Sequence, residues 1–92
     1  MKFLAITRRR IESFGEAEMA EALILEAEAA RNAYARGDIR ELYSRGDVPG
    51  AVLVLEAEDV EGAWRLIEAL PMFQNGMMDV EIIPLDPYRG FV

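Results

Sequence analysis

Residues 51–55 read Ala-Val-Leu-Val-Leu, and this run constrains the fold more than any other segment. An unbroken apolar run is typical of a β-strand covered on both faces, because a strand with one face in water alternates apolar and polar residues. The chain has 92 residues and two long helical patterns, enough to cover one face of a sheet. The run therefore predicts that a second copy of the chain covers the other face.

The two helical patterns lie on either side of this strand. Residues 16–36 are dense in Ala, Glu, Leu and Arg without Gly or Pro, and Gly37 follows where a helix C-cap is expected. Residues 58–70 open with acidic side chains and carry apolar residues at helical spacing until Pro71, which cannot continue a helix. Both segments are predicted to be amphipathic helices.

Four strands complete the pattern, at residues 2–7, 38–45, 51–55 and 77–85, with a Gly- and Pro-containing turn at 46–50. The order β-α-β-β-α-β predicts a single α+β domain over residues 1–92 of ferredoxin-like type. In this fold a four-stranded antiparallel sheet carries two helices on one face. Pairing of the open faces predicts a dimeric α+β barrel, as a homodimer or a higher oligomer of dimers.

The amino-acid composition limits the kinds of catalytic and metal-binding group that the chain can offer. The chain has no His and no Cys, so an imidazole base, a thiolate nucleophile and an ordinary zinc site are excluded, and we expect no metal. Acid-base work is left to carboxylates, Tyr and Lys2. A net charge of −7 disfavours nucleic acid, and no apolar run approaches the roughly 20 residues that cross a bilayer. With no sign of a secretion signal, we expect a soluble cytoplasmic protein.

Glu26 is the principal candidate for proton transfer. At about 100° per residue it shares one face of the first helix with small apolar side chains and Met19. A carboxylate turned toward an apolar interior has a raised pKa and can exchange protons near neutral pH. The alternative is that Ile24 and Leu25 mark the buried face, which would leave Glu26 at its edge, solvated or paired with an Arg.

Two motifs resemble the muconolactone isomerase family: Leu-Pro-Met-Phe at residues 70–73 and Met-Asp-Val-Glu-Ile-Ile-Pro-Leu at residues 78–85. Glu26 falls at the position of a family Glu in the first helix. Arg40, Leu42 and Tyr43 stand where these isomerases show Arg, Leu and Trp. Glu41 replaces the family His, and the connection at 74–77 is longer than the family's Pro-Tyr.

The resemblance implies a cofactor-free intramolecular isomerase that shifts a carbon-carbon double bond within an unsaturated lactone or ring acid. Glu26 would carry the proton, and Arg40 would bind the carboxylate of a small anionic ligand, since a guanidinium binds carboxylates in a fork. Tyr34, Tyr43 and Phe73 would border the ligand. The Arg8-Arg9-Arg10 triplet, expected in a loop, either attracts an anionic ligand at the pocket mouth or is simply solvated.

Two other functions remain open. The chain could be a non-catalytic small-molecule-binding or assembly protein that retains the barrel. It could also be a cofactor-free enzyme of another kind that acts on an aromatic substrate, with Trp64, Tyr34 and Tyr43 around one cavity. Glu26 buried in a pocket beside Arg40 would favour the enzyme. An exposed Glu26, or a cavity filled by Phe73, would favour the binding protein.

Overall fold

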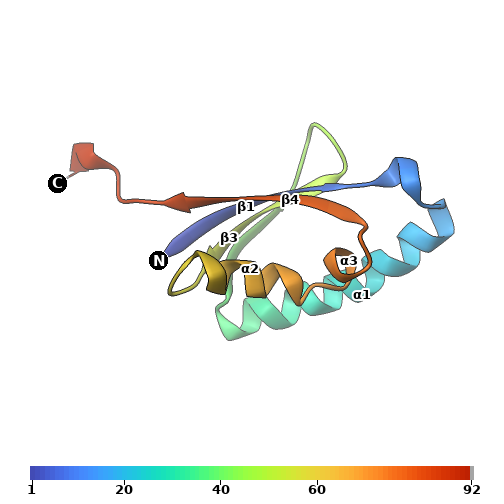
Figure 1. Ribbon diagram of the computed structural model, residues 1–92, viewed down its shortest axis with the longest axis horizontal. Helices are drawn as coiled ribbons and strands as arrows, with labels where there is room; N and C mark the ends of the chain where they lie inside the picture. The colour runs from blue at the N-terminus through green and yellow to red at the C-terminus, as the bar shows by residue number, and fades with distance from the viewer. Residues whose placement is uncertain (92) are drawn as a thin grey trace.

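The computed structural model describes residues 1–91 and has the predicted order of strands and long helices. One antiparallel sheet contains the strands in the order β2-β3-β1-β4. Three α-helices lie on one face of this sheet, and the longest of them is α1 (Figure 1). The strands are β1 (Lys2–Arg9), β2 (Ile39–Ser44), β3 (Gly50–Glu56) and β4 (Met78–Leu85), and the helices are α1 (Glu16–Arg36), α2 (Val60–Glu68) and α3 (Pro71–Gln74).

Three short elements were not predicted. The 3₁₀ helices Ile11–Ser13 and Arg89–Phe91 are single turns, and α3 begins at Pro71, which therefore opens a new helix as well as ending the preceding one. The prediction that a loop begins directly after Thr7 is also wrong. There β1 continues through Arg9, because Arg8 pairs with Gly50 and Asp79, and Arg9 pairs with Met78.

The long helix α1 ends as its sequence predicts. Gly37 adopts a φ of 85°, a left-handed conformation that favours Gly. The N–H groups of Gly37 and Asp38 donate to the carbonyls of Tyr34 and Ala33, which are in the last turn of the helix. This capping fixes the direction in which the chain enters β2.

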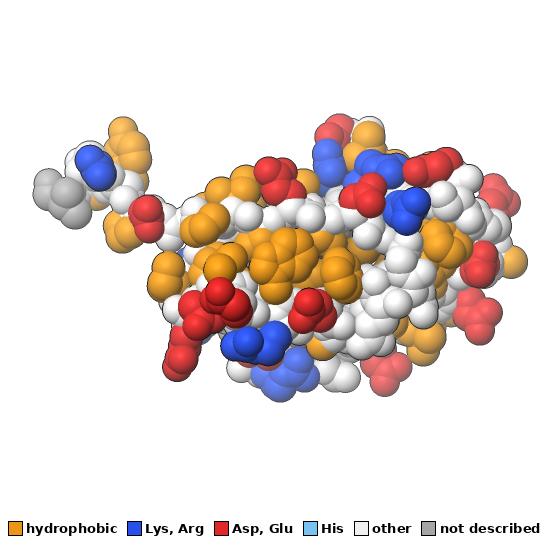
Figure 2. Space-filling model, viewed as in Figure 1, with side chains coloured by type: hydrophobic (Ala, Val, Ile, Leu, Met, Phe, Trp, Pro, Cys, Tyr) orange, Lys and Arg blue, Asp and Glu red, His pale blue; other side chains and the backbone are white. Residues whose placement is uncertain are grey.

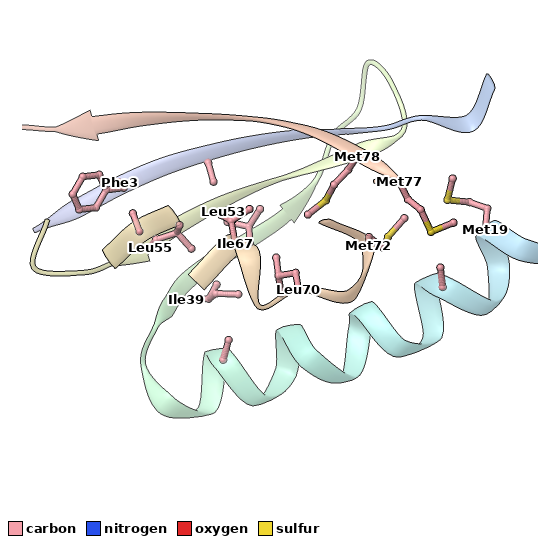
Figure 3. Close-up of a cluster of buried hydrophobic side chains, with 14 residues drawn as sticks. Phe3, Met19, Ile39, Leu53, Leu55, Ile67, Leu70, Met72, Met77 and Met78 are labelled. Carbon is pink, nitrogen blue, oxygen red and sulfur yellow. The ribbon is translucent and has the colours of Figure 1, made fainter. Parts of the chain in front are cut away.

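The core lies between the sheet and the helices (Figure 3). Its largest fully buried side chains are Phe3, Leu55, Ile67 and Met72. Figure 3 shows Met19, Met72, Met77 and Met78 gathered toward the end of the sheet where α1 begins. Methionine packs well in irregular space, so this end of the core can border a cavity without strain.

Asp59 caps α2, since its Oδ1 accepts a hydrogen bond of 2.7 Å from the N–H of Gly62. Asp59→Ala leaves that N–H without a protein partner at the helix end. We expect the free energy of unfolding to fall by about 1 kcal/mol, the usual value of an N-cap. Urea denaturation followed by circular dichroism measures the change. An unaltered midpoint would contradict this role.

The other face of the sheet has no helix over it within residues 1–91 (Figure 1). At its centre Leu4 lies opposite Val54 and Ile83, and Ile6 lies opposite Val52. Carboxylates occupy the same face on the edge strands, where Glu41 is on β2 and Glu81 is on β4. The face therefore has an apolar centre between polar edges.

The surface is mixed in character. In the view of Figure 2, acidic side chains are scattered over the domain, and apolar side chains gather between the sheet and the helices. The segment after β4 extends away from the body of the domain (Figures 1 and 2). None of the helices formed by residues 1–91 has the length and apolar character needed to cross a membrane.

Candidate active site

A cavity of about 270 Å³ lies between α1 and the helix-bearing face of the sheet, with residues beside and within α3 as a further wall. Most of its lining is apolar. Contributors include Leu23, Ala30, Leu42, Leu53, Leu70 and Met72. Five residues with polar side chains also line it: Thr7, Arg9, Glu26, Tyr43 and Ser44. A few polar groups set in an apolar cavity are typical of small-molecule sites.

Glu26 lies on the inner face of α1, as predicted. On the same face Met19, Ala22 and Ala33 are buried, whereas Ile24 is 70% exposed and Leu25 is 52% exposed. The alternative in which Ile24 and Leu25 mark the buried face is therefore wrong. The small side chains along this stripe leave room for the carboxylate between the helix and the sheet.

The Glu26 carboxylate is half-buried and fixed in place by one hydrogen bond. Its Oε1 accepts from the backbone N–H of Met72 at 3.0 Å. That N–H is in the first turn of α3, where helical N–H groups have no partner within the helix. The carboxylate thus ties α1 to α3 while lying on the wall of the cavity.

Burial raises the pKa of Glu26 above its usual 4.5, and the hydrogen bond from Met72 opposes this only in part. Within residues 1–91 Glu26 forms no ion pair. Desolvation is thus not offset by a neighbouring cation, and the neutral form is favoured relative to a carboxyl in water. The group is suited to both accept and return a proton.

Arg9 supplies the positive charge in this cavity. It shares the helix-bearing face of β1 with Phe3, Ala5 and Thr7, because alternate residues of a strand point to the same side. Sequence reasoning did not select it individually, since the first strand was expected to end at Thr7. Continuing the alternation of inward- and outward-facing residues from Thr7 to Arg9 would have placed Arg9 on the helix-bearing face of the sheet.

The structure places Arg40 outside the cavity. A register shift separates Ile39 from Glu41, and the Arg40 Nε donates to the carbonyl of Gly37 at 2.9 Å. Its Nη2 lies 3.9 Å from a carboxylate oxygen of Glu56, and the side chain is 51% exposed. Arg40 and Glu26 are therefore not brought together in this chain, contrary to the sequence-based expectation.

Tyr43 borders the cavity, but its hydroxyl does not point into it. The hydroxyl donates to Glu41 at 2.9 Å, and these two residues of β2 share the open face of the sheet. The carboxylate acceptor raises the pKa of the Tyr43 phenol. Strand alternation gives the inner face to Leu42 and Ser44 instead.

Tyr34 and Phe73 lie on other surfaces. Tyr34 is 61% exposed and lines a shallow groove with Arg31 and Leu42, next to the cavity but outside it. Phe73 is partly buried and packs against Trp64 with ring centroids 6.3 Å apart. Because Phe73 does not line the cavity, it does not fill it. No group of three His, Cys, Asp or Glu side chains suited to a metal ion occurs among residues 1–91.

Comparison with known proteins shows the family of this chain. A family model described as muconolactone delta-isomerase matches residues 1–90. The chain belongs to this family. The match confirms the resemblance seen in the two C-terminal motifs, and the protein is muconolactone isomerase-like. A comparison with curated protein sequences finds no match.

Two solved structures share the fold. A muconolactone isomerase superposes with a TM-score of 0.81 at 21% identity, over 97% of this chain and 92% of that one. The 5-chloro-2-hydroxyhydroquinone dehydrochlorinase TftG from Burkholderia phenoliruptrix AC1100, in complex with 2,5-dihydroxybenzoquinone, superposes with a TM-score of 0.77 at 16% identity. That match covers 98% of both chains. These likenesses confirm the ferredoxin-like α+β fold.

Proposed function

We propose that this muconolactone isomerase-like protein is a cofactor-free intramolecular isomerase acting on a small unsaturated lactone or ring acid. The observation that carries the proposal is the half-buried Glu26 carboxylate, fixed by Met72 on the wall of a largely apolar cavity. The family match supports the reaction class, and the geometry supports the choice of Glu26.

In the proposed reaction the Glu26 carboxylate removes a proton from a carbon conjugated with the ring carbonyl, which in an α,β-unsaturated lactone is the γ-carbon at the far end of the double bond. The electron pair of the broken C–H bond delocalises into the conjugated system, and the negative charge rests mainly on the carbonyl oxygen. The neutral carboxylic acid then returns the proton to a different carbon, which completes the shift of the double bond. No oxidant, metal or second substrate is required, and the carboxylate is regenerated.

We further propose that the open face of the sheet pairs with the same face of a second copy to form the dimeric α+β barrel. Leu4, Ile6, Val52 and Val54 give this face an apolar centre, and the edge-strand carboxylates give it a polar rim. This distribution is typical of protein interfaces. Pairing would also cover the second side of β3, as its unbroken apolar run predicts. The cytoplasmic location stays a prediction.

A proton-exchange assay tests the isomerase directly. Muconolactone and related unsaturated lactones are incubated with the protein in D₂O and followed by NMR for deuterium uptake and double-bond migration. Since the carboxylate is the active form and its pKa is raised, kcat/KM should increase with pH through an apparent pKa above 4.5.

A non-catalytic binding protein is the second candidate, supported by the departures from the family pattern at Glu41 and at residues 74–77. Under that hypothesis the lactones would bind without deuterium uptake above the uncatalysed rate. Such a result, with a folded protein and detectable binding, would reject the isomerase and retain the pocket.

A further inference from the structure

We propose that Arg9 anchors the carboxylate group of the ligand inside the cavity and thereby selects small organic acids over neutral molecules of the same shape. The inference rests on the proposed function only in taking this cavity as the ligand site. It replaces Arg40 with a different residue, on a different strand, as the partner of the anion.

The three consecutive arginines at the end of β1 have different environments. Arg8 points to the open face, where it binds Glu12 and Asp79 at 3.0 and 2.8 Å. Arg10 lies 4.0 Å from Asp79 and donates to the carbonyl of Gly76. Only Arg9 of this triplet lines the cavity.

The Arg9 guanidinium makes no side-chain hydrogen bond or ion pair within residues 1–91. In the same part of the chain, Arg36 and Arg45 each bind a neighbouring Asp, at 3.0 and 2.8 Å. Arg9 is partly buried, and a guanidinium has up to five N–H donors to satisfy. An anion in the cavity is the natural partner for it.

Glu26 lines the same cavity but forms no ion pair with Arg9. The two groups are therefore separated, and a ligand can place a carboxylate at Arg9 while its ring carbon faces Glu26. Without a cation, a negatively charged ligand would be repelled by the Glu26 carboxylate that must act on it. Arg9 removes this difficulty, and its fork orients the ligand.

The size of the cavity restricts the acid. Its volume of about 270 Å³ lies just below the usual range for ligand pockets, about 300–1,000 Å³. The remaining lining is mainly apolar, and the hydroxyl of Thr7 is already engaged, since it accepts from the N–H of Ala51 at 3.0 Å. A single small ring with one carboxylate fits this chemistry.

Two unreactive probes of nearly equal shape test the proposal. Calorimetric titration compares 2-furoate with its neutral amide, 2-furamide, on the full chain. We expect wild type to prefer the acid, and Arg9→Gln to bind it at least ~10-fold more weakly with 2-furamide binding unchanged, since one charge-assisted fork is lost. Arg65→Gln is the matched control, because it removes an exposed charge outside the cavity and should leave both affinities intact.

A second variant guards against a folding defect. Arg9→Lys keeps the charge but not the fork, so it should bind 2-furoate more weakly than wild type and still prefer it to 2-furamide. Equal binding of acid and amide by wild type, no binding of 2-furoate, or an Arg9→Gln variant with wild-type affinity for 2-furoate would each overturn the proposal.

The Glu26→Gln variant separates this proposal from the isomerase. It should keep the preference for 2-furoate, because it retains Arg9 and removes a negative charge. Arg9-dependent binding without proton exchange on lactones would support the anion site and reject the isomerase. Proton exchange that needs Glu26 but is unaffected by Arg9→Gln would support the isomerase and reject the anion site.

Discussion

Glu26→Gln is expected to lower the rate of proton exchange and double-bond migration by about 10²–10⁴-fold, the usual contribution of a positioned acid-base group. Glutamine has the same shape, and its Oε1 can still accept the hydrogen bond from Met72. The amide cannot take up or return a proton. The variant therefore isolates proton transfer from the structural role of the side chain, and NMR in D₂O measures both rates.

Glu28→Gln is the matched control. Glu28 belongs to the same helix but is exposed and does not line the cavity, so its replacement should leave the rates within twofold of wild type. Equal losses in both variants would point to a general effect of charge, and an active Glu26→Gln would reject Glu26 as the proton carrier.

Stability should distinguish lost chemistry from lost structure. Because burial raises the pKa of Glu26, its neutral form is favoured in the folded state, and the associated stability is present at low pH and lost as pH rises through that pKa. Glutamine has no such titration. At neutral pH the Glu26→Gln variant should therefore melt at or above the wild-type temperature, although its turnover is lower.

Leu4→Asp is expected to convert the proposed dimer to a monomer, with a rise of at least ~10³-fold in the dissociation constant. Leu4 lies on the open face between Val54 and Ile83, both apolar. An unpaired charge buried in an interface costs about 3–5 kcal/mol, and the two-fold symmetry places two such charges in one interface. Sedimentation equilibrium over a range of protein concentrations measures the change.

Ile24→Asp serves as the control, since Ile24 is 70% exposed on the outer surface of α1. This variant should sediment as wild type does. If Leu4→Asp does not fold, Leu4→Lys repeats the test with the opposite charge. A wild type that is monomeric at every concentration, or a folded Leu4 variant that remains dimeric, would contradict the pairing of open faces.

The orientation and the end of α1 could be predicted because both follow from local patterns. The 3.6-residue period of α1 put Glu26 with Met19 and Ala22 on one face, and the structure confirms this arrangement. The end of the helix at Gly37 was equally local, since it depends on the backbone freedom of one residue. Patterns of this kind are properties of a single helix and need no knowledge of its neighbours.

The cation of the site could not be predicted in the same way. Whether Arg9 or Arg40 lines the cavity together with Glu26 depends on where β1 ends and how β2 pairs with β3. Pairing with β3 and β4 extends β1 to Arg9, whereas the register shift beside Ile39 accompanies the contact of Arg40 with Gly37. Both outcomes depend on hydrogen bonds between segments far apart in the sequence.

The sequence by itself determined the order of the strands and the two longer helices, the inner face of α1 and the family of this protein, because periodicity, capping residues and short motifs are local. Only the tertiary structure decided that Met72 holds the Glu26 carboxylate, that Arg9 lines its cavity and that the hydroxyl of Tyr43 faces the other way. Strand register makes that difference, since a shift of one residue moves a side chain to the opposite face of the sheet.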